Sequence, residues 1–135
     1  MTNKLLSSLK LRDVELPNRI VVSPMQMYMA KENGECTDWH LVHLGKFATG
    51  NFGTVFTEVL CVESRGRSTY SDAGIWSDTH IPMLKKIASF IHSQGSIPAA
   101  QIGHCGPKSC RQRPYDGLQP LSSKDAENGE PPWEI

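Results

Sequence analysis

Polar and polarisable side chains stand near the ends of three short apolar runs of this sequence. Ser23, Pro24 and the segment 25–28 (MQMY) follow the first run, Glu58 lies inside the second, and Gln101 lies near the end of the third. Parallel strands gather functional groups at their carboxyl ends, because the loops there vary while the strands hold position. This mixture suits a flat amphipathic cofactor, which needs an apolar wall and a few directed hydrogen bonds.

The three apolar runs are predicted to be strands of one parallel sheet. They cover residues 20–22, 54–62 and 97–102, and β-branched residues are frequent in the first two. A short hairpin over residues 9–16 is expected ahead of them, because apolar and polar residues alternate there.

Two amphipathic helices are predicted between these strands. The first has Thr37 or Asp38 as its cap and stops at Gly50, and the second has Asp78 as its cap and stops at Gly95. The resulting order of strand, helix, strand, helix, strand is typical of right-handed βαβ units. The fold class is therefore expected to be α/β.

Composition narrows the possible partners. The 135 residues include 14 Lys plus Arg and 14 Asp plus Glu, so the chain has no net field to attract nucleic acid or anionic lipid. Neither a signal peptide nor a membrane-spanning run is recognisable, and we expect a cytoplasmic protein with reduced cysteines. Residues 111–135 are polar and rich in proline, and they are expected to be a loop or a disordered tail.

Two groups of potential metal ligands are interpreted without a metal. His40 and His43 lie three residues apart on the first predicted helix, where surface exposure or packing between helices is the preferred interpretation. His104, Cys105 and Cys110 contain no Cys-x-x-Cys pair, so zinc is not expected.

Three further positions have structural interpretations. Glu58 is expected to have a partner inside the fold, since a buried carboxylate requires one. Cys61 is expected to pack as a small hydrophobe. The triplet 65–67 (RGR) is expected to be a solvated turn.

Four motifs in order resemble the old yellow enzyme family, the FMN-dependent NAD(P)H:flavin oxidoreductases. They are residues 16–25 (LPNRIVVSPM), 37–41 (TDWHL), 74–78 (GIWSD) and 101–106 (QIGHCG). The sequence is most similar to the bacterial NADPH dehydrogenase branch that is often called thermophilic-like. The resemblance covers nearly the whole chain, and it corresponds only to the N-terminal part of the proteins of that family.

The resemblance implies a set of cofactor contacts. Pro24 and Met25 are similar to the residues that contact the flavin ring, and Val59 stands where a small residue meets the isoalloxazine. Gln101 resembles the glutamine whose amide bonds the pyrimidine edge of the ring, where a donor and an acceptor are both useful. Gln26 occupies a position where this branch often has cysteine, and its amide can still donate to the ring. These five residues are the expected FMN-binding set.

The resemblance also implies a substrate contact and a reaction. Tyr28 is similar to the aromatic residue that approaches substrate above the ring. A family-type enzyme takes hydride from NADPH or NADH onto FMN and then reduces an activated alkene such as an enone. Related branches reduce dienoyl thioesters or demethylate amines, so the substrate and the choice between NADPH and NADH stay open. Full-length relatives are expected to form homo-oligomers.

The implied fold is the N-terminal portion of a TIM (β/α)8 barrel, with about three βα units and an N-terminal hairpin. Residues 1–135 then form a partial FMN-binding barrel domain, whereas a complete barrel needs about 250 residues. The histidine pair and proton-donating tyrosine of the family lie in later units, so no catalytic residue is expected within the chain. Residues 106–108 (GPK) also depart from the Gly-Arg-Lys of the family.

Two hypotheses follow. The chain is a fragment of an FMN-dependent NAD(P)H oxidoreductase of the ene-reductase type, or it is a non-catalytic remnant or binding module that folds only with a partner.

Overall fold

The computed structural model describes residues 3–106, 109 and 111–117. Several positions interpreted above therefore lie outside the described residues, namely Pro107, Lys108, Cys110 and the part 118–135 of the expected tail.

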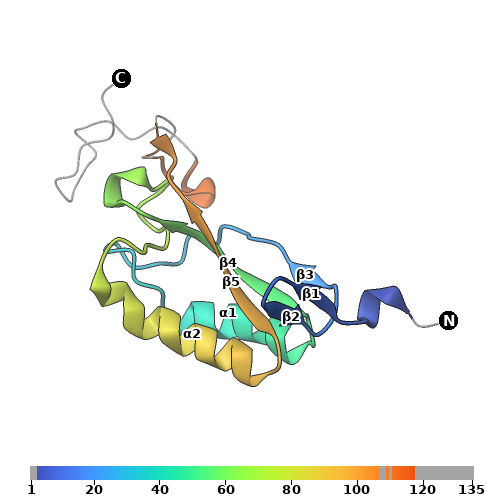
Figure 1. Ribbon diagram of the computed structural model, residues 1–135. Helices are drawn as coiled ribbons and strands as arrows, with labels where there is room; N and C mark the ends of the chain where they lie inside the picture. Colours follow the sequence, from blue (N-terminus) through green and yellow to red (C-terminus); the bar gives the residue numbers. More distant parts are fainter. Residues whose placement is uncertain (1–2, 107–108, 110, 118–135) are drawn as a thin grey trace.

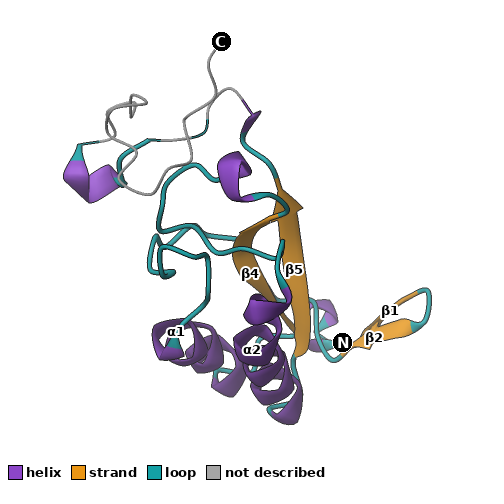
Figure 2. Cartoon of the chain, turned by 90° about the vertical axis from the view of Figure 1, so that its left-hand side faces the viewer, coloured by secondary structure: helices purple, strands orange, loops and turns teal. Residues whose placement is uncertain are grey.

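A parallel sheet of three strands and two helices forms the centre of the described structure. The strands are β3 (Val21–Val22), β4 (Thr54–Cys61) and β5 (Ile97–Gly103), and they lie side by side in the order β3-β4-β5. Helix α1 (Asp38–Thr49) connects β3 to β4, and helix α2 (Ile81–Ser93) connects β4 to β5. Both helices cover the same face of the sheet (Figures 1 and 2). The predicted α/β order is confirmed.

An antiparallel hairpin precedes the sheet, as predicted. Its strands are β1 (Leu9–Leu11) and β2 (Val14–Leu16), and Leu9 pairs with Leu16. The hairpin lies at the end of the sheet opposite the loops that follow β4 and β5 (Figure 1). Four short 3-10 helices complete the described elements, at Lys4–Leu6, Ser64–Gly66, Asp78–His80 and Pro114–Asp116.

The predicted N-cap is right for the first helix and wrong for the second. Thr37 is the N-cap of α1, and its backbone N–H donates to Nδ1 of His40 over 2.9 Å. The expectation that Asp78 caps the second helix is wrong. Ser77 caps a 3-10 turn that leads into α2, because its hydroxyl accepts from the Thr79 N–H at 3.3 Å, and Asp78 lies inside this turn.

The hydrophobic core lies between the sheet and the helices. Val55 of β4 is completely buried, and Ile87 and Ile91 of α2 are 2% and 1% exposed. Cys61 is also fully buried, as expected for a small hydrophobe. The other buried members of this cluster are Val22, Ala30, Cys36, Leu44, Ala48, Leu60 and Ala73.

A β-bulge interrupts the pairing of β4 with β5. Phe56 pairs with Ala99, but Val59 pairs with Gln101, so two residues of β4 face the single residue Ala100. A bulge redirects the side chains that follow it. The carboxyl half of β4 therefore presents different residues to each face than an unbroken strand would.

The loop after β4 corrects the expectation of a solvated turn at residues 65–67. Arg65 is exposed and forms an ion pair with Glu63, but Arg67 is only 7% exposed. Its guanidinium donates to the carbonyl oxygens of Glu32, Ser64 and Tyr70. Arg67 is buried because these backbone acceptors, which come from two loops, satisfy its charge.

Trp76 joins the same two loops. Its ring lies over Gly34 and Gly74, where an added Cβ would overlap the indole, and the Gly74 N–H donates to the Gly34 carbonyl at 2.9 Å. The Arg67 guanidinium lies 5.2 Å from the indole centre, within the range of a cation–π contact.

No helix among the described residues is long and apolar enough to cross a membrane.

Truncation of Ile91 tests the position of the core. We expect Ile91→Ala to lower the free energy of unfolding by about 3 kcal/mol, since it removes buried methyl groups and leaves a cavity. The matched control is Ile81→Ala on the same helix, because Ile81 is 53% exposed. The control should change stability by less than about 1 kcal/mol in urea titrations. Equal losses in the two variants would contradict the described packing.

Thiol reactivity tests the burial of Cys36 and Cys61. Burial raises the pKa of each thiol from 9.0 to about 12, with a further rise from the charge of Glu58 at Cys36 and of Asp72 at Cys61. The thiolate is the reactive form, so a pKa three units higher leaves about a thousandfold less of it below pH 9. Alkylation at pH 8, followed by peptide mass spectrometry, should modify both residues only after denaturation. Rapid modification of either one in the folded chain would contradict this burial.

Candidate functional site

Val59 and Gln101 lie opposite each other on β4 and β5, near the carboxyl ends of both strands. Partners in a parallel ladder project to the same face, so the two side chains are neighbours. Gly103 confirms this arrangement, because a Cβ added there would approach Cγ1 of Val59 to 2.9 Å. The structure brings these two predicted site residues together.

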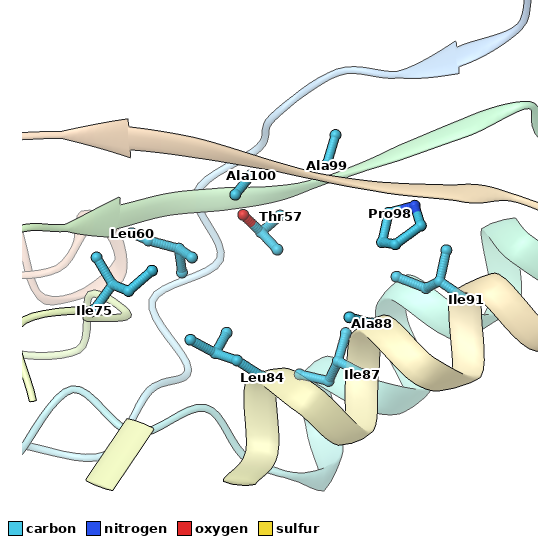
Figure 3. Close-up of a pocket in the computed structure, with 10 residues that line it drawn as sticks. All are labelled: Thr57, Leu60, Ile75, Leu84, Ile87, Ala88, Ile91, Pro98, Ala99 and Ala100. Carbon is cyan, nitrogen blue, oxygen red and sulfur yellow. The ribbon is translucent and has the colours of Figure 1, made fainter. Parts of the chain in front are cut away.

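Their face is the one that the helices leave open. Thr57, Leu60 and Pro98 point toward α2 and line an apolar cavity of about 240 Å³ between that helix and the sheet (Figure 3). Neither Val59 nor Gln101 lines this cavity. Side chains alternate along strands, so Val59 and Gln101 project away from it. The apolar cavity therefore belongs to the helix-covered side, and the candidate site lies on the opposite face.

The segment that follows β3 runs beside β4 toward the same end of the sheet. Val22 pairs with Val55, and five residues further on the Met27 N–H donates to Oε2 of Glu58 at 2.5 Å. Pro24 and Met25 lie between these two points of attachment. Met25 is 44% exposed and Pro24 is half-buried. Both predicted residues are thus held next to the strand that carries Val59.

Gln26 has a buried donor without a partner. Its Nε2 atom is inaccessible to solvent, and it makes no hydrogen bond within the described part of the chain. An unpaired buried amide costs free energy, so Nε2 of Gln26 lacks an acceptor that the described part of the chain does not supply. By contrast, the amide of Gln101 lies on an exposed residue and is open to a ligand from solvent.

Tyr28 has an unusual backbone conformation. Its φ is 60°, a left-handed value that is rare for a bulky residue. Its carbonyl oxygen accepts from the Tyr115 hydroxyl at 2.9 Å, which connects the segment to the loop after β5. Burial raises the pKa of Tyr28, and the charges of Asp72 and Glu58 add to this rise. The phenol is therefore held protonated over an extended pH range.

Glu58 has the structural partner that a buried carboxylate requires, and that partner is His40. Both residues are almost fully buried, and Nε2 of His40 lies 3.1 Å from Oε1 of Glu58. The expectation of surface exposure or helix packing is wrong for His40, because its ring points from α1 toward β4. His43 stacks on Trp39 with the ring centres 4.7 Å apart, which is a contact within α1, so the expectation of packing between helices stays untested for His43.

The ends of β4 and β5 are also connected. His104 Nε2 lies 3.1 Å from Oε2 of Glu63, and the Cys105 N–H donates to the Gly66 carbonyl at 2.7 Å. Hydrogen bonds from His104 and then Arg65 lower the pKa of Glu63 below its ordinary value. These contacts give His104 a role in joining two loops at the site end of the sheet.

The chain is similar to known proteins of one family. The model of the NADH:flavin oxidoreductase / NADH oxidase family matches residues 4–130. Among solved structures, the chain is similar to 2-naphthoyl-CoA reductase in its complex with 2-naphthoyl-CoA, at 25% identity and a TM-score of 0.73. That alignment covers 78% of this chain and 16% of the reductase.

Two further structures have the same fold. Old Yellow Enzyme from Pichia sp. AKU4542 is 24% identical with a TM-score of 0.75, over 89% of this chain and 31% of that enzyme. Morphinone reductase in complex with tetrahydroNAD is 23% identical with a TM-score of 0.71, over 90% of this chain and 33% of that enzyme. The chain thus spans a third or less of the length of each of these three structures. The sheet and its two helices have the architecture of part of a TIM (β/α)8 barrel, and no closed barrel is present within the described ranges.

Replacement of Gln26 tests whether its amide lacks a partner. Gln26→Met keeps the length of the side chain and removes the buried donor, so we expect the ligand-free chain to become more stable by about 1 kcal/mol. The control is Gln94→Met at the exposed end of α2, which should leave the urea midpoint unchanged. A destabilised Gln26→Met chain would mean that the amide does have a partner.

Proposed function

Because the chain belongs to the NADH:flavin oxidoreductase / NADH oxidase family, we propose that the open face of its sheet forms one wall of an FMN site in an NAD(P)H oxidoreductase. The observation that carries this proposal is the pairing of Val59 with Gln101 on the face that the helices leave free. This pairing sets an apolar side chain beside an amide, at the end of the sheet where parallel strands gather their ligands.

The residues present fit such a group. Val59, Pro24 and Met25 offer apolar and polarisable contact to a flat ring, and two amides offer directed hydrogen bonds. Gln101 presents a donor and an acceptor, which suits the pyrimidine edge of a flavin. Gln26 contributes the buried donor that has no partner in the described protein. We propose these five residues as the FMN contacts of this chain.

FMN, when bound, would supply hydride transfer from a reduced nicotinamide to an activated alkene such as an enone. The proposed work of this chain is to orient the ring, exclude water from one face of it and present Tyr28 to substrate. Use of a nicotinamide is supported by morphinone reductase, which binds tetrahydroNAD. NADPH and NADH are both retained as co-substrates in this proposal, and no residue of the chain is proposed as a proton donor.

Titration with FMN tests the proposed wall. We expect the chain to quench FMN fluorescence and to shift its visible spectrum, and Gln101→Ala to raise the dissociation constant about five- to tenfold, as for the loss of one hydrogen bond. Gln94→Ala is the matched control, since Gln94 lies at the exposed end of α2. Anaerobic addition of NADPH or NADH should then bleach the bound flavin if the chain also supports reduction.

Other outcomes would decide against parts of this proposal. A chain that binds FMN without reduction would act as a binding module. Equal effects of the Gln101 and Gln94 substitutions would remove Gln101 from the site. A folded chain that binds no FMN would exclude the oxidoreductase role for this chain alone.

A further inference from the structure

The carboxylate of Glu58 connects three parts of the chain. It lies on β4, where Oε1 is 3.1 Å from Nε2 of His40 on α1 and Oε2 accepts from the Met27 backbone N–H at 2.5 Å. Glu58 and His40 are 4% and 3% exposed. Burial of two such groups is costly without full hydrogen bonding, so their arrangement needs a physical reason.

The neighbouring backbone determines which nitrogen of His40 carries the proton. Nδ1 accepts from the Thr37 N–H at 2.9 Å, so this atom keeps its lone pair. The proton of a neutral imidazole is then on Nε2, which donates to Glu58. Glu58 therefore receives two N–H donors, one on each oxygen. The other tautomer of His40 would carry its hydrogen on Nδ1, where it could not accept from the Thr37 backbone N–H.

The Met27 N–H lies in the middle of the segment 25–28, which contains three of the proposed ligand contacts. Among the described residues, the backbone from Met25 to Met29 makes no hydrogen bond to another backbone group. Two side chains hold it instead, since Glu58 accepts at Met27 and Tyr115 donates to the Tyr28 carbonyl. The left-handed φ of Tyr28 is strained for a bulky residue and persists only where the surroundings impose it.

We infer that Glu58 and His40 are positioning residues: the pair clamps the segment 25–28 against β4 and thereby sets Met25, Gln26 and Tyr28 at the proposed FMN site. This inference rests on the proposed function for the identity of the ligand. The clamp itself is a property of the chain and is measurable without FMN. Neither residue of the pair is required to touch the ligand.

Glu58→Gln is the test of the clamp. The amide of glutamine has one uncharged oxygen acceptor. If this oxygen faces the Met27 N–H, a bond to a carboxylate is replaced by a weaker one, and if it faces His40 Nε2–H, the NH2 group stands against the Met27 N–H. We expect the Met27 amide to exchange with deuterium at least about tenfold faster, as for the loss of a hydrogen bond to a charged group. Amides in β4 and β5 should keep their rates. The dissociation constant of FMN should rise by a similar factor, and the spectrum of the bound flavin should shift.

A second substitution should restore the pairing. In Glu58→Gln with His40→Gln, the side-chain oxygen at position 40 accepts from the NH2 group at position 58, whose own oxygen is free to accept from Met27. We expect Met27 exchange and FMN affinity to return to within about threefold of the original chain. The control His43→Gln alters the same helix at a ring that stacks on Trp39, outside the hydrogen bonds of Glu58, and it should change neither value.

The outcomes separate this inference from the proposed function. Unchanged Met27 exchange in a folded Glu58→Gln chain, or equal acceleration of all strand amides in it, would overturn the clamp. If Glu58→Gln fails to fold, His40→Asn removes only the donor to Oε1 and should produce a smaller increase at the same amide. A chain that binds no FMN but shows the local change at Met27 would retain the clamp and lose the proposed ligand.

Discussion

The β-bulge in β4 is the constraint on which the arrangement of the site depends. If the register at Phe56 and Ala99 continued without it, Val59 would lie opposite Ile102, which follows the helix-facing Ala100 by two residues. The extra residue instead pairs Val59 with Gln101 on the open face. It also leaves Glu58 in position to contact Met27 and His40. Bulges are uncommon in parallel ladders, and this one stands beside the proposed site, as bulges frequently do.

The order of the elements could be predicted from the sequence because hydrophobic period is a local property. Residues 54–62 are rich in β-branched side chains, and the apolar positions of α2 recur at helical spacing. Arg67 could not be predicted in the same way. Its acceptors are the backbone carbonyls of Ser64 and Tyr70, three residues away on either side, and of Glu32 in a distant loop. Every residue has a backbone carbonyl, so residue types do not show which carbonyls will meet a guanidinium. A basic triplet around a glycine therefore indicates a solvated turn even where the fold buries it.

The site was predictable to a similar degree. The meeting of Val59 and Gln101 follows from the convergence of parallel strand ends, but residue types contain no sign of the bulge that permits it. A partner for Glu58 could be expected from its burial, whereas His40 was grouped with His43 because both fit the helix. The spacing Thr37-x-x-His40 was the available signal. At the third position of a helix a side chain bends back to the cap, and this one does so through Nδ1.

The packing of Trp76 against Gly34 and Gly74 has an evolutionary consequence. The indole occupies space that a side chain at Gly34 or Gly74 would need, so these three positions are coupled in the substitutions they can accept. Exchange of Trp76 for a small residue would release Gly74, where ordinary side chains could then accumulate. Gly34 would remain restricted, since its φ of 82° disfavours any residue with a Cβ. Descendants of this sequence should therefore replace Trp76 before they replace Gly74, and they should keep Gly34 longest.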